Sequence, residues 1–112
     1  MKIMKSFVKN TDVLLEKVAP GMTRQIMGYT PNLMVVRVFF EKNAIGYNHT
    51  HHHEQVSYVE KGKFEVNIDG KKAILEAGDA FVVAPHLDHG ALCLEDGILI
   101  DTFSPRREDF LK

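Results

Sequence analysis

The histidines of this sequence are concentrated in one short segment. Four of its six histidines lie within five consecutive positions that begin at His49. Alternate side chains of an extended strand share a face. One face of this segment would therefore carry His49, His51, His53 and Gln55. Two neutral imidazoles on one face can chelate a transition-metal ion, so the segment predicts a metal site with further ligands from another strand.

A second segment can supply one of those further ligands. A Gly-Asp pair at positions 78–79 opens a strand candidate, and Pro85 closes it shortly before His89. His89 is then able to return to the metal site from a neighbouring strand, and three imidazoles in this arrangement favour metal binding. The two histidines outside this set of ligand candidates, His52 and His86, are interpreted either as structural or as residues that support the ligands from behind.

Length and composition fit a single globular domain. The chain has 112 residues, of which 45% are hydrophobic and 26% charged, and a chain of this size forms one core. Its net charge of -1 offers no basic field for phosphate backbones or anionic lipid, so neither nucleic acid nor a membrane is an expected partner.

The single cysteine, Cys93, cannot form an internal disulfide and is interpreted as a small buried hydrophobe. The first residues contain no apolar run long enough for a signal peptide, and the expected compartment is the cytoplasm.

Apolar residues recur with a period near two in short runs separated by Gly, Pro, Asn and Asp, which is typical of short strands. These strands would position the ligands. This pattern predicts an all-β sandwich or barrel. Turn signals at positions 60–63 and at Asp69-Gly70 both predict antiparallel hairpins. The expected strands are residues 33–40, 55–60, 64–68, 71–75, 80–83, 91–94 and 98–103.

Two arginines interrupt this apolar pattern. Arg37 lies in the strand 33–40 on the face opposite its buried apolar side chains, and that face is a candidate lining for a polar cavity. Arg24 and Arg37 either line such a cavity or pair with surface acids. Residues 14–18 fit a helical turn or a short strand, and residues 105–112 form at most a short terminal helix.

The two histidine segments resemble the two motifs of the cupin superfamily. The first motif is matched by Gly46, His49, His51, Gln55 and Gly62, and the second by Gly78, Asp79, Pro85 and His89. The resemblance implies one cupin barrel, a double-stranded β-helix, over residues 1–112, with the motifs at about 46–62 and 78–90. It also implies that one divalent transition-metal ion binds to His49, His51, Gln55 and His89.

His53 competes with Gln55 for the role of fourth ligand, since both share the nominal face, and the family pattern selects Gln55. The glutamine supplies a neutral oxygen where the motif usually has glutamate. The ion would keep its full charge, which favours Lewis-acid chemistry on an anionic ligand. Nickel, zinc, manganese, iron and copper all suit these ligands.

A narrower resemblance is to the cupins of pectin degradation, which linearise 4,5-unsaturated uronates released from pectin and alginate. It is carried by residues 20–26, 49–55 and 101–110. The resemblance implies that Asp101, Phe103 and Arg107 lie beside the metal and act in catalysis. Asp101 would transfer protons, Arg107 would pair with the substrate carboxylate, and Phe103 would orient the sugar. The implied partner is a small sugar acid.

Two other functions fit the same residues. An iron-dependent dioxygenase is one, because three histidines and a weak fourth ligand also describe oxygen-activating cupins. A cupin that binds a small acid without turning it over is the other. The resemblance further implies a homodimer, because cupins of this size often pair through their N-terminal strands.

Overall fold

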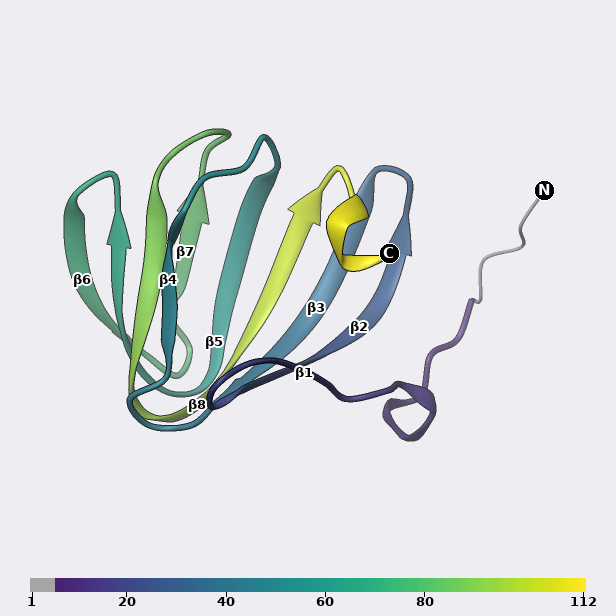
Figure 1. The fold of residues 1–112 in the computed structure, drawn as a ribbon, viewed down its shortest axis with the longest axis horizontal. Coiled ribbons are helices and arrows are strands. Elements are labelled where there is room, and N and C mark those ends of the chain that lie inside the picture. The colour runs from purple at the N-terminus through teal and green to yellow at the C-terminus, as the bar shows by residue number, and fades with distance from the viewer. Residues whose placement is uncertain (1–5) are drawn as a thin grey trace.

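The computed structural model describes residues 6–112, and strands make up most of this part of the chain (Figure 1). The strands are β1 (Glu16–Ala19), β2 (Met22–Thr30), β3 (Leu33–Phe40), β4 (Ile45–His49), β5 (Glu54–Ile68), β6 (Lys71–Glu76), β7 (Ala80–Val83) and β8 (His89–Ser104). The short 3-10 helices η1 (Asn10–Asp12) and η2 (Glu108–Phe110) precede and follow them. The all-β prediction is confirmed. Residues 1–5 lie outside the described residues. The sequence analysis assigns them to the single domain and expects no signal peptide there.

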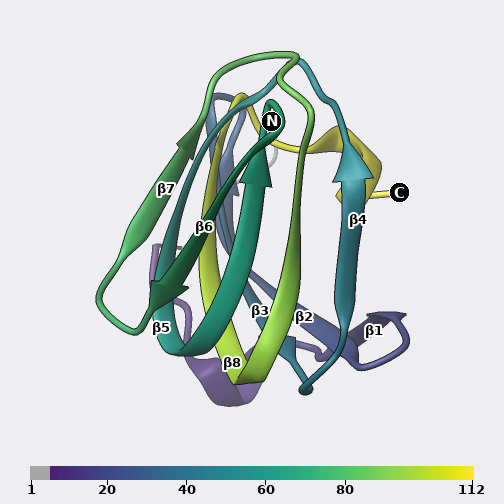
Figure 2. The ribbon, with the colours of Figure 1, turned by 90° about the vertical axis from the view of Figure 1, so that its left-hand side faces the viewer.

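The strands form one continuous eight-stranded sheet that folds over into two halves, described below as the first and the second sheet, and β5 and β8 run through both halves. The first sheet has the order β1-β2-β3-β8-β5-β7 and uses the C-terminal half of β8. The second has the order β4-β8-β5-β6 and uses the N-terminal half of β8. All of these strand pairs are antiparallel. Figure 2 shows the two sheets facing each other, with β5 and β8 curving from one to the other at the bottom of the view.

Two glycines allow β5 and β8 to bend together. Gly62 of β5 has a φ of 87°, and a Cβ added to it would lie 2.6 Å from the Cα of Gly97 in β8. The register between the strands shifts on either side of Lys61. The sequence predicts a turn at 60–63 and two shorter strands in place of each long one. This prediction is wrong, because the backbone contact between the glycines permits a shared bend that leaves both strands continuous.

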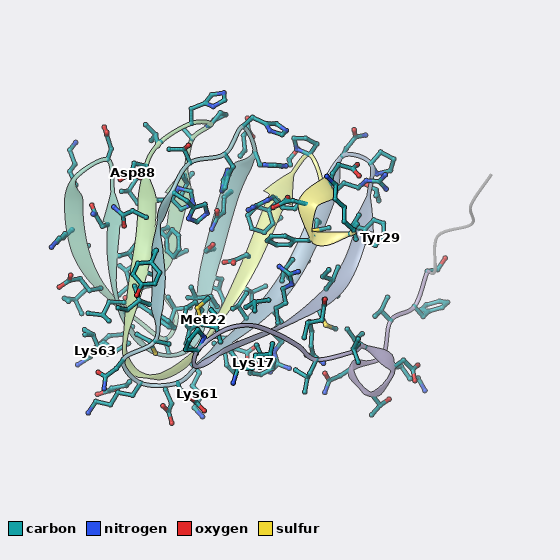
Figure 3. All side chains as sticks on the ribbon, viewed as in Figure 1. Lys17, Met22, Tyr29, Lys61, Lys63 and Asp88 are labelled. Carbon is teal, nitrogen blue, oxygen red and sulfur yellow. The ribbon has the colours of Figure 1, made fainter. Side chains whose placement is uncertain are left out.

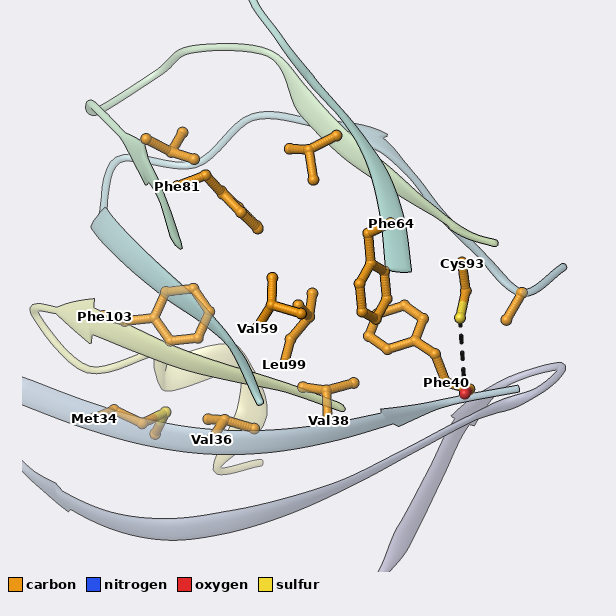
Figure 4. Packing of buried hydrophobic residues seen from close by; sticks show 13 residues of the cluster. Met34, Val36, Val38, Phe40, Val59, Phe64, Phe81, Cys93, Leu99 and Phe103 are labelled. Atoms are coloured by element: carbon orange, nitrogen blue, oxygen red, sulfur yellow. Dashed lines mark hydrogen bonds between the residues drawn. The ribbon is translucent and has the colours of Figure 1, made fainter. Parts of the chain in front are cut away.

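The interior between the sheets has an apolar end. Inward-facing side chains pack around Phe40 and Phe64, whose rings meet edge to face with centroids 5.1 Å apart (Figure 4). The most deeply buried of the other apolar side chains are Met34, Val36, Val59, Val83 and Cys93. Burial of apolar area of this kind is the main stabilising contribution to the fold.

The opposite end of the interior is polar. Here the inward positions are Gln55 and Ser57 in β5 and His89 and Asp101 in β8. In Figure 3, Asp88, the neighbour of His89, lies toward the upper end of the molecule, and Lys61 lies at the lower end. The same two strands therefore supply the apolar core and the polar site.

The turn predicted at Asp69-Gly70 is confirmed. Both residues have positive φ, 50° and 79°, and the turn joins β5 to β6 with Ile68 opposite Lys71. Positive φ at both central positions is the requirement of a type I′ hairpin turn, which Asp-Gly satisfies. The undecided segment at 14–18 ends in the short strand β1.

Of the two roles that the sequence allows Arg37, the structure shows pairing with a surface acid. Its side chain lies on the outer face of β3 and donates a hydrogen bond to Glu60, with 2.8 Å between nitrogen and oxygen. The inner face of β3 carries only apolar side chains, so Arg37 does not line the cavity. Among residues 6–112, no helix has the length and apolar character needed to cross a membrane.

Candidate metal centre

Two strand ends bring the histidines together. His49 is the last residue of β4 and pairs with His89, the first residue of β8. His51 lies in the connection between β4 and β5, where its carbonyl accepts a hydrogen bond of 2.7 Å from the backbone N–H of His86. The continuous strand expected from His49 to Gln55 is thus interrupted. The three histidines nevertheless meet, because the connection folds back over the end of β8.

The three imidazoles are oriented by backbone carbonyls. One ring nitrogen from each lies within 4.8 Å of the others, close enough to share an ion after small side-chain rotations. The Nδ1 atoms of His49, His51 and His89 lie 3.0, 3.1 and 2.9 Å from the carbonyl oxygens of Tyr47, His53 and Leu87, respectively. A carbonyl only accepts, so each Nδ1 carries the hydrogen and each Nε2 keeps its lone pair. This is how histidine ligands are usually held in metal sites.

The electrostatics of this cluster suit a cation. Burial lowers the pKa of His51 and the pKa of His89, so both imidazoles are neutral at pH 7. His89 is 4% exposed, and its Nε2 has no hydrogen-bond partner among residues 6–112. A buried lone pair without a partner is costly unless a ligand satisfies it. The three histidines therefore fit a divalent metal ion.

Gln55 is placed as a fourth candidate ligand. Its Oε1 lies 3.0 Å from the Nε2 of His51. Two ligand atoms that share an ion at about 2.1 Å and at a right angle would lie about 3 Å apart. The competing candidate, His53, is buried but lies outside the three-histidine cluster, and its ring packs against that of His52, with centroids 3.9 Å apart. The geometry favours Gln55 over His53.

A chain of hydrogen bonds links Gln55 to Asp101. The Gln55 amide nitrogen donates to Ser57 Oγ over 2.9 Å, and the Ser57 hydroxyl donates to Asp101 Oδ1 over 2.5 Å. An ionised carboxylate only accepts, so Ser57 must donate to Asp101 and accept from Gln55. The amide oxygen of Gln55 is consequently turned toward His51.

The environment of Asp101 tunes its carboxyl group. Burial raises the pKa of Asp101 to about 6, and the hydrogen bond from Ser57 and the positive charge of Arg107 oppose this rise. A carboxyl group that titrates near neutral pH can both accept and return a proton. Asp101 is therefore suited to proton transfer next to the three histidines.

Phe103 and Arg107 lie beside the same cluster. The Phe103 ring packs edge-on against His51, with centroids 5.8 Å apart. Arg107 is buried, and its guanidinium lies 5.0 Å from the centre of the Phe103 ring. The Nε and Nη2 of Arg107 donate to the two carboxylate oxygens of Asp109 over 3.0 and 2.8 Å, which holds the pKa of Asp109 low. One edge of the guanidinium is therefore already paired.

A cavity of about 140 Å³ lies beside the histidine cluster. Its lining includes His49, Gln55, His89, Asp101 and, from β2, Arg24. The structure shows both roles that the sequence allows Arg24, because the residue lines the cavity and its Nε lies 3.7 Å from Glu16 Oε1. The strand that carries it is absent from the sequence prediction, because polar residues occupy both faces of β2. Gln25, for example, faces the other way and donates to Asn10 Oδ1 in the N-terminal segment.

Replacing Ser57 by alanine is expected to weaken the site. Ser57 is fully buried, and its loss leaves the Gln55 amide without the acceptor that orients it. We expect a loss of about 1–3 kcal/mol in the free energy of unfolding, and about a 10-fold loss in metal affinity. Urea unfolding and calorimetric titration measure the two effects. Thr102→Ala, which changes a hydroxyl on the outer face of β8, is the control, and equal effects from both variants would contradict this role of Ser57.

Replacing Gly90 by alanine is expected to separate β4 from β8. A Cβ at this position would lie 2.8 Å from Gly46 O and would collide with the side chain of Asn48. Both residues belong to β4, the strand that carries His49. Because β4 must move away, metal affinity is expected to fall by about 10-fold or more. Gly28→Ala is the matched control, since a Cβ at Gly28 would meet nothing within 4 Å. Calorimetric titration with zinc compares the two, and unchanged affinity in Gly90→Ala would contradict the prediction.

The fold and the histidine cluster define the class of protein. The cupin domain model matches residues 36–100, which contain both histidine segments. The chain belongs to the cupin family, and within that family it groups with the proteins called KdgF.

Three relatives support this placement. The pectin degradation protein KdgF of Dickeya dadantii (strain 3937) is 44% identical over 110 residues, which cover 96% of this chain and 100% of that protein. The structure of KdgF from Halomonas sp. matches with a TM-score of 0.91 and 46% identity, covering 95% of this chain and 98% of that one. An RmlC-like cupin from Shewanella frigidimarina NCIMB 400 matches with a TM-score of 0.92 and 51% identity, covering 95% and 96%. The predicted cupin barrel and the resemblance to pectin-degradation cupins are confirmed.

Proposed function

We propose that this protein is a metal-dependent isomerase that opens the ring of 4,5-unsaturated uronates from pectin or alginate breakdown. One observation carries the proposal: a single cavity is lined by three of the four candidate metal ligands, His49, Gln55 and His89, and by Asp101, whose pKa is raised to about 6. The similarity to the pectin degradation protein of Dickeya dadantii supports it.

The proposed reaction rearranges one molecule. An unsaturated uronate carries an enol ether next to its carboxylate. Its anomeric hydroxyl loses a proton, and the bond between the anomeric carbon and the ring oxygen breaks, which gives an aldehyde and an enolate. The enolate takes up a proton on carbon and becomes a ketone. Substrate and product contain the same atoms, so the step needs proton transfer but no oxidant or reductant.

The ligand set provides the binding surface for the sugar oxygens. A divalent ion held by His49, His51, Gln55 and His89 would supply Lewis-acid polarisation of those oxygens. Because Gln55 is neutral, the ligands add no negative charge that would repel an anionic sugar. The lone pairs of the histidines are fixed by backbone carbonyls, so the site is organised before the substrate arrives.

Asp101, Phe103 and Arg107 complete the proposed catalytic set. Asp101 takes the proton from the substrate hydroxyl and returns a proton to carbon, while Ser57 holds its other oxygen in place. Phe103 gives an apolar wall beside His51. Arg107 contributes positive charge that attracts an anion, and contact of its Nε–Nη2 edge with a carboxylate requires Asp109 to release it.

The size of the cavity favours a single sugar ring. About 140 Å³ is small beside the roughly 300–1,000 Å³ of typical pockets for drug-sized ligands. A polysaccharide chain would need an open groove across the surface. We therefore propose the monouronate, and not the polymer, as the substrate.

The proposal is tested by loading the purified protein with nickel, zinc, manganese or iron and adding the unsaturated monouronate. The conjugated double bond absorbs in the ultraviolet, and its loss reports the reaction. We expect metal-dependent loss well above the spontaneous rate, abolished by His51→Ala. The absence of acceleration with every metal would overturn the proposal. Oxygen consumption in that case would identify a dioxygenase, and tight binding without turnover would identify a binding protein.

We also propose that the protein is a homodimer. β1 is an edge strand of the first sheet, and on its outer side it pairs with no strand within residues 6–112. Leu14 and Leu15, which lead into β1, are exposed. An edge strand next to exposed apolar side chains is suited to pairing with a second copy. Light scattering at micromolar concentration is expected to give twice the chain mass, and a monomer mass would contradict the proposal.

The cysteine content supports the cytoplasm as the proposed compartment. Cys93 is the single cysteine, and its side chain is fully buried. Burial raises the pKa of its thiol, so the thiol is unreactive. A protein whose stability involves no disulfide is suited to a reducing compartment.

A further inference from the structure

Arg24 differs from the other arginines of the chain in its surroundings. It lies in β2, at the register position opposite the inward-facing Val38, and its side chain is 18% exposed. It lines the same cavity as His89 and Asp101. A guanidinium therefore forms part of the wall of the site.

The charge of Arg24 is incompletely paired. The nearest carboxylate is that of Glu16, whose Oε1 lies 3.7 Å from Arg24 Nε, beyond hydrogen-bond distance. The Nε atom itself is buried and has no hydrogen-bond partner in the described part of the chain. Its guanidinium carbon lies 4.1 Å from the centre of the Phe110 ring, which fixes the plane of the group. A largely buried guanidinium without a hydrogen-bonded acid is costly, and an anionic ligand would remove that cost.

The other arginines already have hydrogen-bonded acids. Arg37 bonds Glu60, Arg106 bonds Glu108, and Arg107 bonds Asp109. Arg37 moreover lies on the outer face of the sheet. Among the arginines, Arg24 thus combines a position in the cavity wall with a guanidinium that lacks such a partner.

We propose that Arg24 binds the carboxylate of the substrate and selects acidic sugars over neutral ones. This inference rests on the proposed function and names the group that recognises its substrate. A guanidinium matches a planar carboxylate with two parallel hydrogen bonds. The ring oxygens of the sugar then face the histidines, and its carboxylate faces β2. Arg107 adds electrostatic attraction for the substrate carboxylate. Because its Nε–Nη2 edge is already bonded to Asp109, we assign the direct hydrogen bonds to the carboxylate to Arg24.

The test compares Arg24→Gln with wild type in the metal-loaded protein. The substrates are the unsaturated monouronate and its methyl ester, which lacks the negative charge. For the acid, we expect KM to rise by about 10- to 100-fold with kcat changed by less than about 3-fold, because a charged hydrogen bond is lost. For the ester, we expect equal KM values in the two proteins. Arg37→Gln is the matched control, since it removes an arginine from the outer face of the neighbouring strand. An unchanged KM for the acid in Arg24→Gln would overturn the proposal.

A binding measurement separates this proposal from the proposed function. Glucuronate has the carboxylate but no double bond, so its binding is measured by calorimetry whether or not turnover occurs. We expect Arg24→Gln to weaken glucuronate binding by about 10-fold or more. Weak turnover of the uronate with Arg24-dependent glucuronate binding would reject the reaction and retain the carboxylate site. Equal glucuronate affinity in both proteins would reject the carboxylate site.

A second variant covers the case in which Arg24→Gln does not fold. Glu16→Gln leaves Arg24 in place and removes its nearest carboxylate, which is partly exposed on β1. Because Arg24 then has no competing acid, glucuronate is expected to bind at least about 2-fold more tightly. Binding that is unchanged or weaker in Glu16→Gln would overturn the proposal.

Discussion

Replacing His89 by alanine is expected to abolish stoichiometric metal binding. His89 is the most buried of the three clustered histidines, and its Nε2 points to no other partner within residues 6–112. Removing a residue that only hydrogen-bonds to a metal ligand already lowers metal affinity by about 10- to 100-fold. Removing a ligand itself is therefore expected to lower metal affinity by at least about 100-fold. Elemental analysis after dialysis and calorimetric titration with zinc or nickel measure this effect. Turnover of the proposed substrate is expected to disappear with the metal.

His52→Ala is the matched control for this experiment. His52 belongs to the same histidine run but is exposed and lies outside the three-histidine cluster. Its removal is expected to leave the metal content and affinity unchanged. If His89→Ala retained the wild-type affinity, or if His52→Ala lost it, the metal site would have to be placed elsewhere in the run.

Local sequence patterns were sufficient for elements that depend on neighbours in the chain. The strand β3 matches the prediction for 33–40, because its inner face alternates Met34, Val36, Val38 and Phe40 without interruption. The Asp69-Gly70 turn is equally local, since its two backbone conformations follow from the residue types. The long strands were not predictable in this way. The bend at Gly62 depends on Gly97, which is distant in sequence and adjacent only after β5 and β8 pair.

The site could be predicted to the extent that its residues are chemically unusual. A run of histidines points to a metal whatever the fold. His89 could also be predicted as a ligand, because it follows a strand candidate that can lie beside the histidine run. Asp101 and Arg107 needed the family resemblance, because one acid in a strand and one arginine in a polar tail are common on surfaces. The role of Ser57 was not predictable, because a serine carries no signal until its neighbours are known. The sequence allows Arg24 two roles, since its strand lacks the alternation of apolar and polar residues that reveals an inner face.

Replacing Asp101 by asparagine is expected to have opposite effects on turnover and on stability. Loss of the proton-transfer group is expected to lower kcat by about 100- to 10,000-fold. The folded-state pKa of about 6 lies above the ordinary value of 3.8, so the folded protein binds more protons than the unfolded chain between about pH 4 and 6. Stability of the metal-free protein therefore falls as pH rises through this window, and the penalty is complete above pH 6. The asparagine variant has no carboxyl group to ionise, so it does not carry this penalty, and its amide oxygen still accepts the hydrogen bond from Ser57.

The sign of the difference in the free energy of unfolding between Asp101→Asn and wild type can be measured. At pH 7.5 the metal-free Asp101→Asn variant is expected to be more stable than wild type by about 1–3 kcal/mol in urea unfolding, and the difference is expected to vanish near pH 4. Asp109→Asn is the control with the opposite sign. The pKa of Asp109 is held low by Arg107, so its removal is expected to lower stability at pH 7.5, by less than about 1 kcal/mol because the pair is partly exposed. Full turnover in Asp101→Asn, or a variant less stable than wild type at pH 7.5, would contradict the assignment of Asp101 as a desolvated carboxylate that transfers protons.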